Sequence, residues 1–183
     1  MINYQLFHFA APPRTGVSWV IKAAQLIGLG PAFAHQAHMP FPPKERNGPD
    51  SYRVSLVRHP CTWLASCYSA IRYGDLTTNH VAAYTRLDLG TFDQFVRSYL
   101  VTMPGGVGQL YDTYEAECSM RIEDMPDAFL ELADSFGVPK EMSAKCRLLG
   151  KQNMTASPPV WDKGLWKRVM EAERDTVESY DYF

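Results

Sequence analysis

Short apolar runs and segments of helical periodicity alternate along the chain. The aromatic and apolar runs at residues 4–11 and 52–57 predict two buried strands, and residues 117–122 predict a third, weaker strand. Elsewhere apolar residues recur every three or four positions, and Pro60 stands where a helix can begin. Helices are expected at residues 17–29, 60–72, 91–102, 125–136, 140–149 and 162–179.

This order of elements favours the α/β class, in which a parallel β-sheet is flanked by helices. Ligands of such sheets bind beyond the carboxyl ends of the strands. Residues 12–16 and 58–60 follow the first two predicted strands, so we expect the chemistry of the protein there. Prolines at 39–50 and glycines at 103–108 predict loops.

Length and composition fit one globular domain over residues 1–183. Apolar residues make up 46% of the chain and charged residues 21%, which excludes a disordered, collagen-like or coiled-coil protein. No apolar run is long enough to cross a bilayer, and no basic leader precedes an apolar stretch at the N-terminus. We therefore expect a cytoplasmic protein without a membrane partner.

Charge is distributed unevenly, although the net charge is only −2. Residues 1–75 contain seven Lys and Arg against three acids, and residues 140–168 contain seven against two. Two basic segments in an acidic chain suit a small anionic ligand better than a nucleic acid. The four cysteines form no Cys-x-x-Cys pair, so we expect neither a disulfide framework nor a metal site.

The first segment with candidate chemistry follows the first predicted strand and reads Pro-Pro-Arg-Thr-Gly-Val-Ser-Trp over residues 12–19. A turn that enters a helix presents unpaired N–H groups and the positive end of the helix dipole to an anion. Gly16 allows close approach, Arg14 adds a charge and Ser18 adds a hydroxyl. The segment suits a phosphate or a sulfate, although an ordinary strand-to-helix turn would have a similar sequence. It lacks the Lys-Ser/Thr pair of a Walker A loop, which weighs against a nucleotide kinase.

The second segment follows the second predicted strand. Arg58 comes directly after the strand, Pro60 begins a helix, and Ser66 lies eight residues beyond Arg58. Eight residues are about two helical turns, so the hydroxyl of Ser66 could still face a ligand above the strand ends.

Taken together, the two segments resemble the sulfotransferases that use 3′-phosphoadenosine 5′-phosphosulfate (PAPS), in particular small cytosolic or bacterial-type members. Pro-Arg-Thr-Gly-Val-Ser-Trp is similar to their 5′-phosphosulfate loop, and Arg58-x-Pro followed by Ser66 is similar to their 3′-phosphate motif. The order and separation of the two motifs also match. Residues 122–125, Phe136-Gly137 and the end of the chain at Tyr180 resemble further family segments, so the resemblance spans residues 5–182.

The resemblance implies a P-loop-like fold and the transfer of a sulfuryl group from PAPS to a hydroxyl or amine of a small-molecule acceptor. Arg14 and Ser18 would stabilise the leaving group, and Trp19 would lie against the adenine. Arg58 and Ser66 would bind the 3′-phosphate. The 5′-phosphosulfate would be held by Arg14 and by the amides of Thr15, Gly16, Val17 and Ser18.

A general base is expected in the segment His-Gln-Ala-His-Met-Pro at residues 35–40, which is similar to the family's Lys-Thr-His-Leu-Pro. His38 is the matching position, and a histidine is well suited to proton transfer near neutral pH. Gln36 stands where the family has a lysine that helps the leaving group, so Arg14 would carry more of that task. His35 and an acid such as Glu45 remain alternative bases.

A basic segment near the C-terminus is a partial match to the loop that closes over the 3′-phosphate in cytosolic family members. Lys163 and Gly164 would contribute to cofactor binding there, although Asp162 replaces the family's arginine. The start of an amphipathic helix would explain the same residues, and Lys151 and Asn153 are alternative closing residues. A non-catalytic protein that binds PAPS or its product is the alternative function, followed by a P-loop nucleotide kinase.

Overall fold

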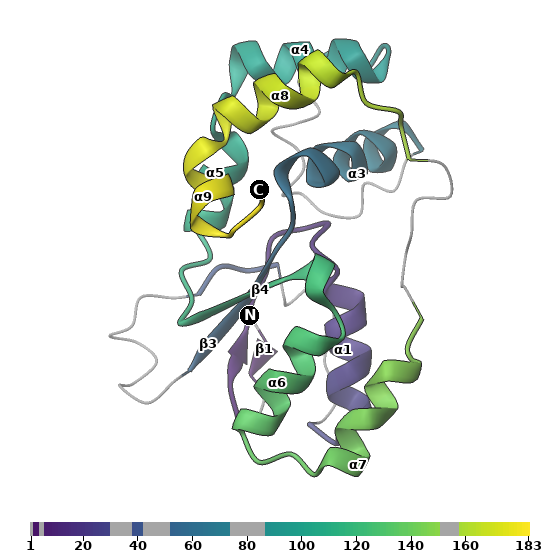
Figure 1. The fold of residues 1–183 in the computed structure, drawn as a ribbon, viewed down its shortest axis with the longest axis vertical. Coiled ribbons are helices and arrows are strands. Elements are labelled where there is room, and N and C mark those ends of the chain that lie inside the picture. Colours follow the sequence, from purple (N-terminus) through teal and green to yellow (C-terminus); the bar gives the residue numbers. More distant parts are fainter. Residues whose placement is uncertain (1, 4–5, 30–37, 42–51, 74–86, 151–157) are drawn as a thin grey trace. The chain divides into compact units, whose positions relative to one another are not determined.

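The chain folds into two compact units, each formed by two separate segments (Figure 1). Met1–Val57 and Thr113–Met154 form the first, which we call the sheet unit, and Arg58–Asp112 and Thr155–Phe183 form the second, the helical unit. The expected α/β class is confirmed, while the expectation of one domain over residues 1–183 stays a prediction. This computed structural model describes residues 2–3, 6–29, 38–41, 52–73, 87–150 and 158–183.

A small sheet organises the sheet unit. Its strands lie in the order β1 (Ile2–Asn3), β2 (His8–Phe9), β3 (Arg53–Val57) and β4 (Cys118–Arg121). β2, β3 and β4 are parallel, and β1 is antiparallel to β2. The three strands predicted from the sequence are therefore β2, β3 and β4.

The first strand is shorter than residues 4–11, where it was expected. The ladder between β2 and β3 continues for one bond beyond Phe9, from the amide of Ala10 to the carbonyl of Val54 (3.2 Å). Pro12 and Pro13 then follow, and neither has an N–H group to donate to a neighbouring strand. The chain therefore leaves the sheet directly before the Arg14 turn.

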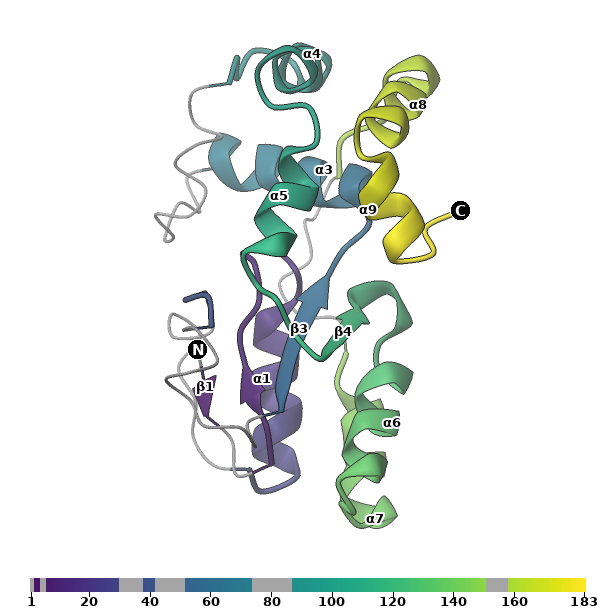
Figure 2. The same ribbon diagram turned by 90° about the vertical axis from the view of Figure 1, so that its left-hand side faces the viewer.

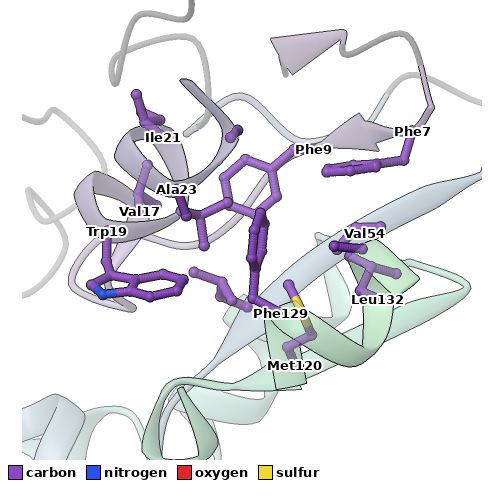
Figure 3. Packing of buried hydrophobic residues seen from close by; sticks show 14 of the residues in the cluster. Phe7, Phe9, Val17, Trp19, Ile21, Ala23, Val54, Met120, Phe129 and Leu132 are labelled. Atoms are coloured by element: carbon purple, nitrogen blue, oxygen red, sulfur yellow. The ribbon is translucent and has the colours of Figure 1, made fainter. Parts of the chain in front are cut away.

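Helices pack against one face of this sheet. Side chains alternate between the two faces of a strand, so Phe9, Val54, Leu56 and Met120 share the face that lies in the hydrophobic core. Figure 3 shows Phe9, Val54 and Met120 packed against side chains of the covering helices, including Trp19 and Phe129. The sheet unit also contains α1 (Val17–Leu26), η4 (Ile122–Asp124), α6 (Asp127–Ser135), α7 (Lys140–Ser143) and η5 (Ala144–Leu148).

The described part of the helical unit consists of helices. α8 packs against α3 and α4, and α9 packs against α5 (Figure 2). α4 begins with a capping box, in which the side chains of Thr91 and Gln94 each accept a hydrogen bond from the other's backbone amide. The bounds are α3 (Pro60–Arg72), α4 (Phe92–Thr102), α5 (Gly106–Asp112), α8 (Lys163–Ala172) and α9 (Arg174–Ser179).

Two expectations for this unit were wrong, and the side chain of Glu173 accounts for the first. Residues 103–108 were expected to be a loop, but α5 begins at Gly106, and the single helix expected at 162–179 is divided at Glu173. The buried carboxylate of Glu173 accepts hydrogen bonds from the amides of Val107 (3.3 Å) and Gly108 (3.0 Å) in the first turn of α5. This contact between segments distant in sequence supplies the cap that the glycine-rich segment lacks locally.

One smaller difference concerns the length of a helix in the sheet unit. The segment 140–149, expected as one helix, is divided into α7 and η5. None of the helices in the described part of the chain is both long enough and apolar enough to cross a membrane.

Candidate functional site

The turn after β2 has an unusual backbone conformation. Arg14 and Gly16 have positive φ angles of 68° and 90°, and Thr15 between them does not. A turn with such angles can direct successive N–H groups to one side, which is the geometry of an anion nest, and we call residues 14–17 the nest. The hydroxyl of the buried Thr15 donates to the carbonyl of Pro12 (2.6 Å), which closes the turn from inside. The segment predicted to hold a phosphosulfate is therefore a tight turn and not an open loop.

The N-terminus of α1 continues this nest. No side chain caps the helix, and its first turn contains no acidic residue that would repel an anion. Gly16 is required here on two grounds. Its φ lies in the left-handed region, and a Cβ at this position would lie 2.2 Å from Cδ1 of Ile122. Close packing of the turn against η4 thus depends on glycine.

The side chains of the segment alternate between outside and inside. Those of Arg14 and Ser18 are half-exposed, whereas Val17 and Trp19 are buried. The indole N–H of Trp19 donates to the carbonyl of Leu149 (3.5 Å), and its ring meets that of Phe129 edge to face (Figure 3). Trp19 is only 5% exposed, so the structure gives no support to its expected stacking on adenine.

His38 lies next to the same turn. Its Nδ1 is 3.1 Å from the carbonyl oxygen of Ala11, one residue before Pro12. A carbonyl can only accept a hydrogen bond, so Nδ1 carries the proton, and the lone pair of the neutral ring is on Nε2. This tautomer is the one that a general base working through Nε2 requires.

Tyr114 fixes the backbone of His38. Its hydroxyl donates to the main-chain carbonyl of His38 (2.7 Å). Burial raises the pKa of Tyr114 to about 12, so the phenol keeps its proton and remains a donor over the whole neutral range. His38 is thus held at its ring and at its backbone.

The predicted second motif forms the start of α3 in the helical unit. Here Arg58 is half-buried, and its Nε donates to the hydroxyl of Thr62 (3.1 Å). Thr62 and Ser66 are four residues apart and therefore lie on the same face of α3. Thr62 is next to the Arg58 turn, and Ser66 is one helical turn further on. Ser66 is buried, with 6% of its surface exposed.

His59 is the N-cap of α3. Its Nδ1 accepts a hydrogen bond from the amide of Cys61 (3.1 Å), and its ring lies against the rings of Trp166 and Tyr182. No role was expected for His59, which directly follows Arg58 in the sequence. Its side chain accepts the hydrogen bond from the helix amide that an Asn or Asp side chain usually accepts at an N-cap.

The basic segment near the C-terminus is helical. Lys163 and Gly164 are exposed in the first turn of α8, and the side chain of Asp162 caps that helix by accepting from the amide of Leu165 (2.9 Å). The structure therefore contains a helix start at this segment, which was the alternative explanation of its sequence. The role of Lys163 and Gly164 in closing over a phosphate stays a prediction.

Several expected residues lie outside the described part of the chain: His35, Gln36, Glu45, Lys151 and Asn153. Conversely, sequence reasoning missed Thr62, Tyr111 and Tyr114. Thr62 could have been noticed from its spacing of four residues from Arg58. The two tyrosines act on main-chain atoms of residues far away in sequence, and no local pattern marks such contacts.

Comparison with known proteins adds no relative. No family model matches the chain, and no similar curated protein or solved structure was found. Among the described residues, no group of three or more His, Cys, Asp or Glu side chains is arranged to hold a metal ion.

Proposed function

We propose that this protein is a sulfotransferase, which transfers a sulfuryl group from PAPS to a hydroxyl or amine of a small acceptor. Its architecture would then be P-loop-like. The observation that supports the proposal is the hydrogen bond between His38 and Ala11, because it holds the imidazole ring next to the turn after β2, with Nδ1 as the donor. A base next to an anion site is what removal of an acceptor proton beside a sulfuryl donor requires.

The residues of the turn fit the sulfated end of such a donor. The nest and the α1 N-terminus offer N–H groups without a competing carboxylate in the first helical turn. Arg14 and Ser18 are accessible enough to contact a ligand. When bound, PAPS would supply the sulfuryl group and a bisphosphate leaving group.

Each side chain then has a defined task. Nε2 of His38 would take the proton of the acceptor as the new bond to sulfur forms. Arg14 and the nest amides would stabilise the negative charge that grows on the 5′-phosphate as its bond to sulfur breaks. No metal is required for either task.

The Arg58 turn would hold the 3′-phosphate. A guanidinium group recognises a phosphate through two parallel hydrogen bonds, which makes it the stronger and more specific partner. Ser66, further along the same face of α3, is the second residue expected at this phosphate; it is only 6% exposed, so the assignment rests on the sequence motif and not on its accessibility. In this proposal Arg14 contacts one phosphate of the nucleotide and Arg58 contacts the other.

Calorimetry with adenosine 3′,5′-bisphosphate and with ATP tests the proposal directly. We expect the bisphosphate to bind more tightly than ATP, and Arg58→Ala to abolish that binding. Arg168→Ala is the matched control, since Arg168 is an exposed arginine of α8 in the same unit. Normal bisphosphate binding by Arg58→Ala would count against the assignment.

Two other outcomes would replace the proposal with its rivals. Tight bisphosphate binding without sulfuryl transfer to a broad panel of hydroxyl and amine acceptors would indicate a non-catalytic binding protein. Magnesium-dependent consumption of ATP would indicate a nucleotide kinase.

A further inference from the structure

A single buried hydroxyl holds both main-chain polar groups of Arg58. The phenol of Tyr111 accepts a hydrogen bond from the amide of Arg58 (3.2 Å) and donates one to its carbonyl (2.7 Å). Arg58 is the first residue after β3, so its backbone has left the strand, and Tyr111 provides the partners that the strand ladder no longer supplies. Tyr111 comes from α5, more than fifty residues away in sequence.

The side chain of Arg58 is held separately. Its Nε–H is directed to the hydroxyl of Thr62, and that hydroxyl donates to the carbonyl of His59 (3.0 Å). A bond at Nε sets the plane of the guanidinium group and therefore the direction of its two terminal nitrogens. Backbone and side chain of Arg58 are thus both fixed before any ligand arrives.

Tyr111 is well placed for this task and poorly placed for any direct contact. It is only 3% exposed, and its ring meets the ring of Tyr180 edge to face. A ligand could not reach the phenol without displacing these neighbours. Its effect on a ligand must therefore pass through Arg58.

We propose that Tyr111 and Thr62 are positioning residues that determine the preference of this protein for a 3′-phosphorylated nucleotide; this inference rests on the function proposed above. Bidentate recognition of a phosphate by arginine is sensitive to the direction of the guanidinium plane. A side chain that is already fixed loses less conformational entropy on binding. Selectivity for the 3′-phosphate then depends on two residues that do not touch it.

The test compares the dissociation constants of adenosine 3′,5′-bisphosphate and adenosine 5′-monophosphate, measured by calorimetry. Tyr111→Phe keeps the ring and removes the hydroxyl, and Thr62→Val keeps the shape and removes the acceptor for Nε. In Tyr111→Phe we expect bisphosphate binding to weaken about tenfold, the effect of losing about 1.4 kcal/mol of hydrogen bonding. Thr62→Val should weaken it about threefold to tenfold. Binding of the monophosphate should change less than about twofold in both variants, because that ligand has no 3′-phosphate for Arg58 to bind.

Tyr68→Phe is the matched control. The phenol of Tyr68 also donates to a main-chain carbonyl in the helical unit, that of Gly90 (3.0 Å), but it makes no contact with Arg58 in the described structure. This variant should leave the ratio of the two dissociation constants unchanged. Circular dichroism and thermal unfolding show whether each variant is folded. Should Tyr111→Phe fail to fold, Thr62→Val tests the same ratio with a change at the surface of α3.

The outcomes separate this inference from the proposed function. A wild-type preference for the bisphosphate that persists in both variants would overturn the inference and leave the function standing. Equal weakening of both nucleotides would also overturn it, since that is the result of a merely structural role. A wild-type protein without any preference for the 3′-phosphate would overturn the proposed function and, with it, the inference.

Discussion

The hydroxyl of Tyr114 donates a hydrogen bond to the main-chain carbonyl of His38 at 2.7 Å. The two residues are 76 positions apart in sequence. His38 also bonds through Nδ1 to Ala11, so its ring and its backbone are tied to two different parts of the sheet unit. The proposed base is therefore held by the tertiary structure on both sides.

Removing the Tyr114 hydroxyl should slow turnover without weakening nucleotide binding. In Tyr114→Phe we expect kcat to fall about fivefold, the effect of losing about 1 kcal/mol of positioning for His38. The nucleotide dissociation constant, measured by calorimetry, should stay within about twofold, because the anion nest is untouched. A drop in affinity as large as the drop in kcat would show that Tyr114 supports the whole unit and not the base.

Alkaline unfolding offers a second measurement on the same residue. Burial raises the pKa of Tyr114 from its ordinary value of 10.0 to about 12, so the fold favours the neutral phenol. The stability that this provides is complete below pH 10 and is lost as the pH rises toward 12. Urea unfolding between pH 8 and about pH 11 should show this loss in the wild type and a smaller one in Tyr114→Phe.

Replacing His38 should affect chemistry alone. His38→Ala should retain binding of adenosine 3′,5′-bisphosphate and lose about 10²- to 10⁴-fold in turnover, the usual contribution of a general base. Added imidazole should restore part of the lost turnover in His38→Ala and should leave the turnover of the wild type unchanged. Unchanged turnover would transfer the role to His35 or to an acid such as Glu45.

A methyl group at Gly16 should destabilise the nest. Gly16→Ala combines a positive φ of 90° with a contact of 2.2 Å to the side chain of Ile122. We expect a loss of about 2–4 kcal/mol in the free energy of unfolding, measured with urea, because strain and overpacking add.

Gly137→Ala isolates the backbone part of that cost. Gly137 also has a positive φ, of 74°, but a Cβ there would meet no described atom within 4 Å. This variant should lose only about 1–2 kcal/mol. Shortening the neighbour in Gly16→Ala/Ile122→Ala should recover part of the difference. Equal losses in the two single variants would show that the approach of Ile122 has no effect on stability.

Glu173 should make the stability of the protein depend on pH. Burial is the main cause that raises the pKa of this carboxyl above its ordinary value of 4.5, against hydrogen bonds from Tyr99, Gly108 and Val107 that lower it. The fold therefore favours the protonated form. The resulting stability is complete below pH 4.5 and is lost as the pH rises through the raised pKa.

Glu173→Gln removes the ionisable group and keeps one acceptor oxygen for the amides of α5. The free energy of unfolding, measured by urea at several pH values from 4.5 upward, should then vary less with pH than in wild type. Glu173→Ala should be less stable than Glu173→Gln by about 1–3 kcal/mol, since it leaves buried amides without a partner. If the free energy of unfolding varied with pH in the same way in wild type and Glu173→Gln, Glu173 would not be the cause of the pH dependence.

Local patterns determined most of the elements. Short apolar runs and the helical period of 3.6 residues placed β3, α1, α3, α4 and α6 close to their observed bounds. They failed at α5 and at the division between α8 and α9. Glycine is a poor helix former, and α5 exists because the carboxylate of Glu173 caps it from another segment.

The sequence by itself determined the α/β class, the turns after β2 and β3, and the residue types available in them, because the prolines and glycines of these two turns lie directly beside the strands and helices that they connect. Tertiary structure alone decided that the ring of Trp19 lies in the core, that the ring of His38 bonds through Nδ1 to Ala11, and that Tyr111 and Tyr114 hold the residues proposed for binding and catalysis. Those contacts join backbone atoms to side chains far apart in sequence. A hydrogen bond to a main-chain carbonyl places no demand on the identity of the residue that carries it, so it leaves no pattern in the sequence.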